Sequence, residues 1–488
     1  MAQAERSALK AQIKSQLETL RVVLPRVPLL LRVALLHILH LSDAAKYLDL
    51  RSDLTVAFLR HLLTESKPSP MSKLQATTLK DPGVQGRIWV STVSSGIPPE
   101  TSIRDAVMAA VDGTKKDLVT ADEKCRVPEL VSVEAEWMSY RAAATSNAKP
   151  PNISEQDKYV EMMKEVKSKV TVLHLHGGAY YVLDPASYRP LCKKLAKLTK
   201  GRIYSVRYRL APQHPFPSAI LDALVSYFTL LYPPPGAVHQ PVPASDIVIS
   251  GDSAGGGLSL ALLQTILEIR RQGIKITWHG REREVPLPAG LALMSPWLDA
   301  VQSLPSWITN VKWDYLPPPN LLSLNVPADS IWPTSPPRRH IYMDDAYLLH
   351  PLANLQLADS WESSPPIYIC TGWECLTDED RYLVSKLTKD GVTVVYEEYE
   401  AMPHVFPFLL GQIPGSRKCL DAMAKFMAAA VEEYTNVASK YTLIKAKTCQ
   451  ESDLDIKTLS PFTIEELKKL ALEAIEEKPE PSKMGLKL

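Results

Sequence analysis

The chain has 488 residues, of which 45% are apolar and 22% are charged, and its net charge is +1. These values are typical of a globular protein with a large apolar core. The near balance of charges excludes the basic surface that nucleic-acid binding requires, so we expect no nucleic-acid partner. Six cysteines occur without a CxxC pair or a ligand spacing with histidine. The sequence therefore predicts neither a metal site nor a disulfide framework, and it favours an intracellular, reducing compartment.

The most apolar stretch lies near the N-terminus, between residues 22 and 41, and prolines and basic residues interrupt it. It is too broken for a membrane-spanning helix and has no small-residue cleavage site, so neither a transmembrane anchor nor secretion is expected. On a helical wheel one half is mostly basic and the other mostly apolar. The basic half holds Arg21, Arg26, Arg32, His37 and His40, and the apolar half holds Leu24, Val27, Leu31, Leu35 and Ile38.

Two interpretations of this amphipathic segment remain open. The favoured one is a helix that packs its leucine half against the protein, as part of a lid. The alternative is peripheral membrane contact through residues 21–41, with the apolar half in lipid. The protein would then be cytoplasmic or attached to the surface of a membrane such as that of the endoplasmic reticulum.

Strands and helices alternate from about residue 130 onward. The expected strands cover residues 131–137, 170–175, 203–206, 246–250, 290–294, 367–370 and 392–396, with helices over 188–200 and 217–231 among them. This alternation predicts an α/β fold with a mostly parallel central sheet flanked by helices. Three parts follow: an N-terminal leader and cap over 1–129, a catalytic domain over 130–440, and a charged, mobile tail over 441–488. A Trp- and Pro-rich insertion at about 297–348 is expected over the carboxyl edge of the sheet.

The sequence G-x-S-x-G occurs once at the end of an expected strand, as Gly251-Asp252-Ser253-Ala254-Gly255. A small-residue helix follows at once. This context predicts a sharp strand-to-helix turn that exposes the Ser253 hydroxyl above the sheet. Alone, the motif is also compatible with a Ser/Gly turn that precedes a core helix and has no catalytic role.

A second glycine-containing turn, His176-Gly177-Gly178-Ala179, follows the strand over 170–175. Acyl transfer places negative charge on a carbonyl oxygen, and closely approaching backbone N–H groups stabilise that charge. Its position upstream of Ser253 is the order found in lipases and esterases. The alternative is a tight turn without a chemical role.

Between these motifs runs Tyr208-Arg209-Leu210-Ala211-Pro212-Gln213-His214-Pro215-Phe216-Pro217. The residues themselves indicate a structural turn that supports the glycine-containing loop. The run closely resembles the Y-R-L-A-P-E-H-P-F-P signature of the hormone-sensitive lipase family of α/β-hydrolases, with His-Gly-Gly before it and Gly-Asp-Ser-Ala-Gly-Gly after it. The resemblance covers about residues 131–431. Gln213 departs from the family's usual glutamate, and Ala179 from its third glycine.

The resemblance implies an α/β-hydrolase fold and a serine nucleophile, Ser253, with His404 as its base. His404 follows the last expected strand and matches the family's H-x-F as His404-Val405-Phe406. Glu374 stands where the family usually has the aspartate that orients the histidine, and Asp378 is the alternative acid. The resemblance also implies an oxyanion hole formed by the N–H groups of Gly177, Gly178, Ala179 and Ala254. It calls for no cofactor and no metal.

The function implied is hydrolysis of a small hydrophobic ester, with a short, acetyl-like group removed from a bulky alcohol such as a sterol or secondary metabolite. Family members with long leaders, the fungal steryl acetyl hydrolase-like proteins and the arylacetamide deacetylases, carry out such reactions. The segment Lys80-Asp81-Pro82-Gly83 with Gly86-Arg87-Ile88-Trp89 is similar to the fungal group. Two alternatives remain: an acyltransferase with the same triad and another acceptor than water, and a catalytically inactive ligand-binding protein on this fold.

Overall fold

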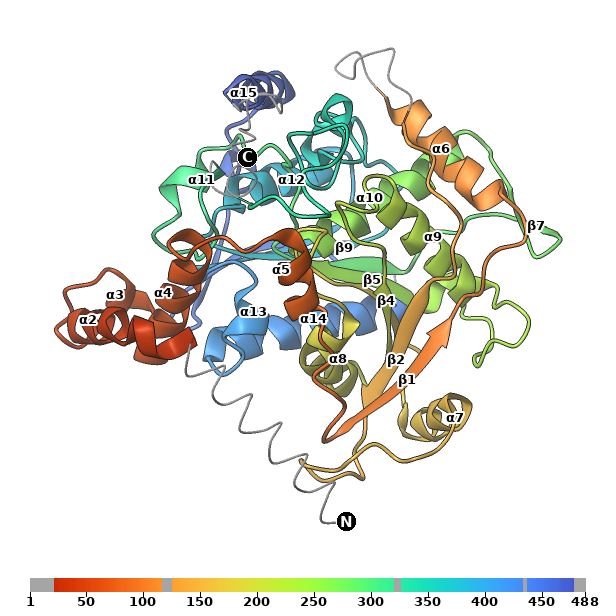
Figure 1. Cartoon of the computed structure of the whole chain (residues 1–488), viewed down its shortest axis with the longest axis horizontal. Coiled ribbons are helices and arrows are strands. Elements are labelled where there is room, and N and C mark those ends of the chain that lie inside the picture. The colour runs from red at the N-terminus through yellow and green to blue at the C-terminus, as the bar shows by residue number, and fades with distance from the viewer. Residues whose placement is uncertain (1–21, 116–124, 320–325, 433–436, 478–488) are drawn as a thin grey trace.

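The computed structural model describes residues 22–115, 125–319, 326–432 and 437–477. Arg21, the polar segment 1–20 and the last part of the expected tail, 478–488, lie outside the described residues. Figure 1 shows the central sheet with helices on both sides and a group of N-terminal helices at one edge.

Within the described residues, the central sheet has ten strands in the order β1-β2-β4-β3-β5-β8-β9-β10-β11-β12. The strands from β4 to β11 run parallel, and among these ten strands the antiparallel pairs lie at the two edges. The strands are β1 (Ile88–Ser94), β2 (Glu134–Tyr140), β3 (Thr171–Leu175), β4 (Arg202–Arg207), β5 (Ile247–Asp252), β8 (Gly290–Met294), β9 (Ile367–Gly372), β10 (Val394–Tyr399), β11 (Lys440–Ile444) and β12 (Glu451–Asp453). A separate hairpin joins β6 (Ile276–Trp278) and β7 (Arg281–Arg283). The predicted mostly parallel sheet is confirmed.

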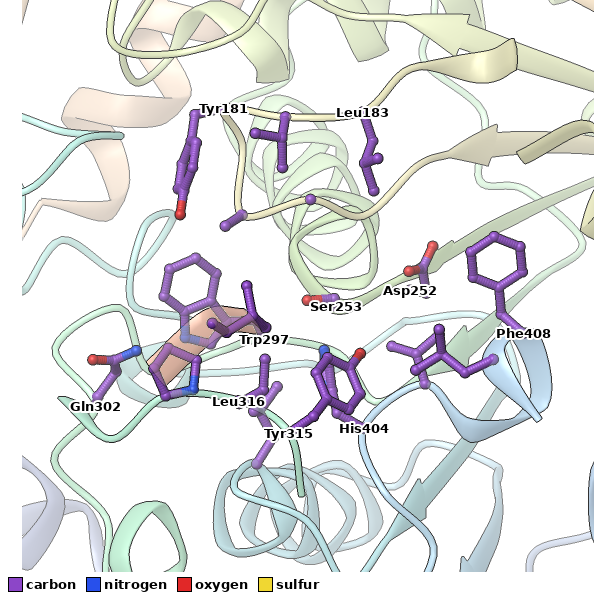
Figure 2. Close-up of a pocket in the computed structure, with 18 of the residues that line it drawn as sticks. Tyr181, Leu183, Asp252, Ser253, Trp297, Gln302, Tyr315, Leu316, His404 and Phe408 are labelled. Atoms are coloured by element: carbon purple, nitrogen blue, oxygen red, sulfur yellow. The ribbon is translucent and has the colours of Figure 1, made fainter. Parts of the chain in front are cut away.

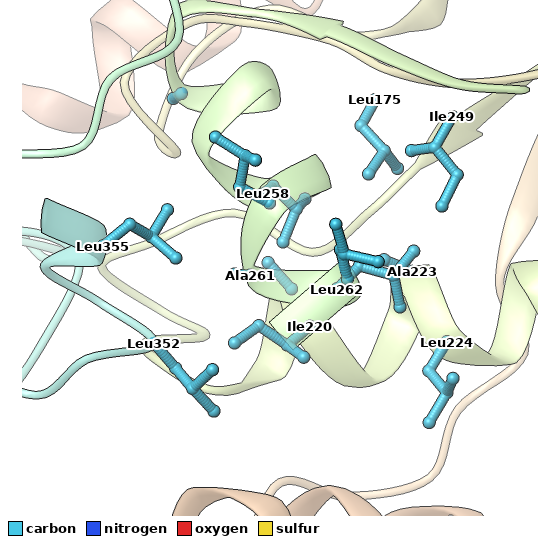
Figure 3. Packing of buried hydrophobic residues seen from close by; sticks show 14 of the residues in the cluster. Leu175, Ile220, Ala223, Leu224, Ile249, Leu258, Ala261, Leu262, Leu352 and Leu355 are labelled. Atoms are coloured by element: carbon cyan, nitrogen blue, oxygen red, sulfur yellow. The ribbon is translucent and has the colours of Figure 1, made fainter. Parts of the chain in front are cut away.

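Helices cover both faces of this sheet, as a parallel sheet with buried strands requires. One face carries α8 (Pro185–Thr199) and α14 (Pro414–Glu432). The other carries α6 (Ser102–Thr114), α9 (Ser218–Leu231), α10 (Ser253–Arg271) and α12 (Thr377–Lys389). Figure 3 shows the core on the second face, where Leu258 and Leu262 of α10 lie near Leu175 and Ile249 of the strands. The remaining helices are α2 (Val27–Ile38), α3 (Ala44–Tyr47), α4 (Leu50–Thr64), α5 (Met71–Thr78), α7 (Glu155–Glu165), α11 (Ser306–Thr309), α13 (Phe406–Leu409) and α15 (Ile464–Glu476).

The expected boundary between a leader and the catalytic domain at residue 129 differs from the structure. β1 pairs antiparallel with β2 along its whole length, so residues 88–94 belong to the sheet. α6 buries Ile103, Val107 and Val111 in the main core. A local pattern does not reveal this, because an antiparallel edge strand is paired with a partner more than 40 residues later in the chain.

The expected mobile tail is also wrong for residues 441–476. β11 extends the sheet as a parallel neighbour of β10, and its Ile444 is fully buried. α15 has a capping box formed by Thr463 and Glu466, and it buries Leu467. The high charge of this region reflects the solvent side of an edge strand and of an amphipathic helix.

The N-terminal helices form a lobe made of α2, α3 and α4, which lies at the edge of the molecule (Figure 1). α2 packs on α4, where His37 contacts Asp53 at 2.8 Å. The leucine half of α2 faces solvent instead of the protein. The favoured interpretation, a leucine face packed on the protein, is therefore wrong, because the contacts with α4 are made by the opposite side of the helix. Among the described residues, no helix is both long enough and apolar enough to cross a membrane.

Candidate active site

Ser253 lies at the sharp turn between β5 and α10, as the motif predicts. Its φ is +51°, a left-handed conformation that is unfavourable for a residue with a side chain. The flanking glycines permit this turn. A Cβ on Gly251 would collide with the carbonyl oxygen of Gly255, and a Cβ on Gly255 would collide with that of Leu175. The glycines are therefore required by the close approach of neighbouring main chain.

His404 and Glu374 are in direct contact. The Nδ1 atom of His404 hydrogen-bonds the Oε2 atom of Glu374, and both side chains are buried. The other carboxylate oxygen, Oε1, accepts hydrogen bonds from the hydroxyl of Ser295 and, at 3.0 Å, from that of Thr371. This network holds Glu374 in one orientation, and it leaves Nε2 of His404 as the nitrogen available to a serine hydroxyl.

Glu374 and His404 each stabilise the charged form of the other. Burial alone would lower the pKa of His404, but the carboxylate of Glu374 raises it above its usual value. Burial alone would raise the pKa of Glu374, but His404 and the surrounding hydrogen-bond donors hold it below its usual value. An ionised carboxylate beside the imidazole is the arrangement that stabilises an imidazolium formed during a reaction.

Asp378, the alternative acid, points elsewhere. Its carboxylate accepts a hydrogen bond from the backbone N–H of Ser306 at 2.9 Å. That contact joins the start of α12 to the insertion. Of the two acids that the sequence left open, the structure brings only Glu374 into contact with His404.

The glycine-containing loop lies beside Ser253. Gly178 has a φ of +108°, and a Cβ there would collide with the carbonyl oxygen of Val182. Ala179 is also left-handed, with a φ of +52°. Gly178 and Ala179 line the same cavity as Ser253. Ala254 follows Ser253 in the first turn of α10, where backbone N–H groups lack an acceptor within the helix.

Gly177 differs from its expected role. Its N–H group donates to the Oδ1 atom of Asp252 and to the hydroxyl of Tyr188, each at 3.1 Å. The Tyr188 hydroxyl in turn donates to Oδ2 of Asp252 at 2.8 Å. Because this N–H is already bound to a carboxylate, Gly177 does not belong to the oxyanion hole. The donors that remain are those of Gly178, Ala179 and Ala254.

Asp252 is thus a residue of the site to which the sequence analysis gave no role. It is buried directly before Ser253, and burial raises its pKa to about 6. Through Gly177 it ties the oxyanion loop to the turn that carries the serine. The signal in the sequence was its place directly before Ser253, as the aspartate of Gly-Asp-Ser-Ala-Gly-Gly.

The Tyr208–Pro217 segment supports the same loop, as the sequence analysis proposed. The Tyr208 hydroxyl donates to the carbonyl oxygen of His176 at 2.6 Å, and the two rings stack. The backbone N–H of Ala211 donates to the carbonyl oxygen of Tyr180 at 2.9 Å. These contacts fix the main chain on both sides of Gly178.

Asp314 of the insertion is a second buried carboxylate near the triad. It accepts hydrogen bonds from the backbone N–H groups of Cys375 at 2.9 Å and His404 at 3.2 Å. Burial and the charge of Glu374 raise its pKa. No motif in the sequence surrounds this residue, and its role depends on contacts with two loops far along the chain.

Ser253 and His404 open into one cavity of about 280 Å³ (Figure 2). Its walls come from the oxyanion loop, the insertion, the loop after His404 and the end of α4. The apolar and aromatic lining residues are Leu63, Tyr181, Val182, Leu183, Tyr188, Trp297, Trp307, Tyr315, Leu316, Pro317, Leu376, Val405, Phe408 and Leu409. The lining therefore favours a hydrophobic ligand.

Comparisons with known proteins agree with this geometry. Residues 172–408 match a family described by the α/β-hydrolase fold. The chain is 30% identical to an acetyl-hydrolase of Streptomyces hygroscopicus over 264 residues, which is 54% of this chain and 77% of the relative. It is 28% identical to an esterase of Acinetobacter venetianus over 267 residues, with the same two shares.

A solved structure shows the same fold. The crystal structure of the esterase EstE5 soaked with p-nitrophenyl butyrate superposes with a TM-score of 0.51 at 22% identity, covering 77% of this chain and 98% of the other. The predicted α/β-hydrolase fold is confirmed. From the fold, the family match and these relatives, the chain belongs to the hormone-sensitive lipase family of α/β-hydrolases and is an enzyme of the carboxylesterase type.

Proposed function

We propose that this enzyme removes a short, acetyl-like acyl group from a bulky hydrophobic alcohol, through an acyl-enzyme formed on Ser253. In the first step His404 takes the proton of the Ser253 hydroxyl, and the oxygen attacks the ester carbonyl. The oxyanion of the tetrahedral intermediate accepts hydrogen bonds from Gly178, Ala179 and Ala254. The intermediate collapses as the C–O bond to the alcohol breaks, and His404 gives its proton to the leaving alkoxide.

Water completes the reaction. His404 takes a proton from a water molecule, the hydroxide attacks the acyl carbonyl, and a second tetrahedral intermediate forms. Its collapse releases the carboxylic acid and returns the proton to Ser253. Glu374 keeps the imidazole oriented through both steps and stabilises its charged form.

One observation carries this proposal: Ser253, His404 and the oxyanion-loop residues Gly178 and Ala179 line a single, mostly apolar cavity of about 280 Å³. Ligand sites of drug-sized molecules begin at roughly 300 Å³, so a cavity of this size suits a short acyl chain together with part of an alcohol. Trp297, Trp307 and Leu316 of the insertion supply apolar surface for that alcohol. The acetyl-hydrolase among the relatives supports the short acyl group.

The test is hydrolysis of p-nitrophenyl esters from acetate to palmitate, with wild type beside Ser253→Ala. We expect the highest kcat/KM for the short esters and a loss of several orders of magnitude in the variant. Ser226→Ala, which removes a buried hydroxyl on α9, is the matched control and retains turnover. An optimum at palmitate would overturn the short-acyl assignment, and turnover retained by Ser253→Ala would overturn the nucleophile.

Product analysis separates hydrolysis from transfer. With a hydrophobic alcohol added to the acetyl ester, we expect free acetate as the main product. Acetylated alcohol as the main product would instead identify an acyltransferase. Failure of a fluorophosphonate to label Ser253 would favour a ligand-binding protein without catalysis.

A further inference from the structure

The helix α2 has an apolar side that is not covered by the described chain. On the inner side, Arg26 donates to the hydroxyl of Ser66 at 2.7 Å, and His37 contacts Asp53. On the outer side of α2 and of the 3-10 turn before it (Leu24–Arg26), four residues expose between 58% and 66% of their surface: Leu24, Leu31, Leu35 and Ile38. Leu39 and Leu41, which follow the end of the helix, are also exposed, at 55% and 69%. We call these six residues the leucine face.

A row of exposed leucines of this length needs an explanation. Scattered apolar residues are normal on protein surfaces, but contiguous apolar patches mark sites that contact a partner or a membrane. Burying six large side chains in water-free surroundings gives a substantial driving force. In the described lobe, the side of α2 in contact with α4 includes Val33, Leu36 and His37. Leu31, Leu35 and Ile38 therefore lie on the side of the helix that faces away from α4.

The charges around the leucine face indicate which partner it fits. Residues 22–42 contain no aspartate or glutamate. Arg32 and His40 are exposed beside the leucines, and Arg32 lies one helical turn from Leu35. An apolar helix face bordered by an arginine, in a segment without acidic residues, is the pattern of a helix that lies in the interface of an anionic bilayer.

The lobe also reaches the active site. Arg60 of α4 donates hydrogen bonds to the carbonyl oxygens of Asp314 at 2.7 Å and Lys312 at 2.9 Å. Leu63, near the end of α4, is half exposed and lines the catalytic cavity. The N-terminal lobe, and with it the leucine face, is therefore firmly attached to the walls of the active-site cavity.

We propose that the leucine face of α2 binds a lipid surface that carries anionic headgroups. The leucines enter the outer part of the acyl region, Arg32 and His40 contact the headgroups, and α4 stays between α2 and the catalytic domain. Figure 1 shows α2 at the outer edge of its lobe, where a flat surface can reach it. The enzyme would thereby be held beside the hydrophobic esters that its cavity fits, which rests on the proposed function.

The experiment is co-sedimentation of the full chain with vesicles. One set is pure phosphatidylcholine, and the other is an equal mixture of phosphatidylcholine and phosphatidylserine. Leu31→Glu/Leu35→Glu is compared with Val160→Glu/Leu472→Glu, a control in which two exposed apolar residues on α7 and α15 are changed in the same way.

We expect wild type and the control to bind the mixed vesicles more strongly than pure phosphatidylcholine. The variant in the leucine face should lose roughly tenfold or more of its partition coefficient. Circular dichroism and turnover of soluble p-nitrophenyl acetate should be unchanged, because neither Leu31 nor Leu35 lines the cavity. Ser253→Ala should bind vesicles as wild type does, which separates a failure of this proposal from a failure of the esterase assignment.

Three results would overturn the proposal. Wild type that stays in the supernatant with both vesicle types would exclude a lipid surface. Equal binding by wild type and Leu31→Glu/Leu35→Glu would place the contact elsewhere. A wild-type dimer in gel filtration that Leu31→Glu/Leu35→Glu converts to a monomer, without vesicle binding, would identify a second copy of the chain as the partner.

Discussion

The carboxylate of Asp314 accepts a hydrogen bond from the backbone N–H of His404 at 3.2 Å, although 90 positions separate the two residues in the chain. The same carboxylate accepts one from Cys375, the residue after Glu374, at 2.9 Å. One side chain of the insertion therefore positions the loops that carry the acid and the base. The insertion is part of the catalytic framework as well as a wall of the cavity.

Replacing Asp314 by asparagine should impair the reaction and change its pH dependence. The negative charges of Glu374 and Asp314 raise the pKa of His404, and His404 must be neutral to accept a proton. Removing the charge of Asp314 lowers that pKa, so the acid limb of the kcat/KM profile should move to lower pH while kcat falls by about tenfold or more. The measurement is kcat/KM against pH for the acetate ester.

Asp329→Asn is the matched control for this experiment. Asp329 also lies in the insertion and accepts backbone hydrogen bonds, from Ser72, Ile331 and Trp332. It makes no hydrogen bond to the triad in the described structure. An equal shift of the acid limb in both variants would show that loosening the insertion, and not the charge beside His404, causes the effect.

Glu374→Gln and Asp378→Asn should differ strongly. Glu374→Gln removes the charge that orients and stabilises the imidazolium, so kcat/KM should fall by about 10²- to 10⁴-fold. Asp378→Asn keeps an oxygen that can accept from Ser306, so turnover should change by less than about threefold. Steady-state kinetics on one ester compares them, and a larger loss for Asp378→Asn would reverse the assignment of the acid.

Gly178→Ala should disable the oxyanion hole. Its positive φ disfavours alanine, and the added Cβ would collide with the carbonyl oxygen of Val182, so the loop must move. We expect kcat to fall by about 10²-fold or more with a smaller change in KM. Gly236→Ala is the matched control, because that glycine also has a positive φ, +84°, but open space around it. Comparable kinetic losses in both would contradict a specific role of the loop.

Asp252→Asn should change the pH dependence of stability. Burial raises the pKa of Asp252 from 3.8 to about 6. The native state therefore holds this proton more tightly than the unfolded chain, and stability falls as pH rises between these values, by about 3 kcal/mol in total. Asparagine has no such proton, so the variant should gain stability relative to wild type between pH 4 and 7.

Urea unfolding at several pH values measures this difference. Asp421→Asn, at an exposed position on α14, is the control and should follow wild type throughout. A free-energy difference between wild type and Asp252→Asn that stays constant with pH would show that Asp252 does not titrate in this window.

Much of the catalytic centre follows from local sequence. The turn at Ser253 was predictable because Gly251 and Gly255 must be glycines. A Cβ on either one would collide with backbone atoms a few residues away or on the neighbouring strand. His404 was predictable from its place after the strand over 392–396, the last one that the sequence predicts. The alternation of strands and helices likewise predicted the parallel sheet, since burial on both faces imposes apolar runs on its strands.

Other features depended on contacts between distant segments. Whether Glu374 or Asp378 reaches His404 is decided by the path of a loop in three dimensions. Whether the N–H of Gly177 is free depends on Asp252, which lies 75 positions later. The strands β1 and β11 fall outside the predicted catalytic domain because their pairing with β2 and β10 joins segments that are far apart in the chain.

The sequence by itself determined the family and the parallel core, and it predicts the nucleophile and the base, because these depend on residue types at short, fixed spacings. It also determined that α2 would be amphipathic. Only the tertiary structure decided that the leucines of α2 face outward, that Asp252 occupies the N–H of Gly177, and that Asp314 holds His404. The physical reason is the same in each case. These features depend on which residues far apart in the chain contact one another, and tertiary packing decides those contacts, whereas the periodicity of the sequence does not.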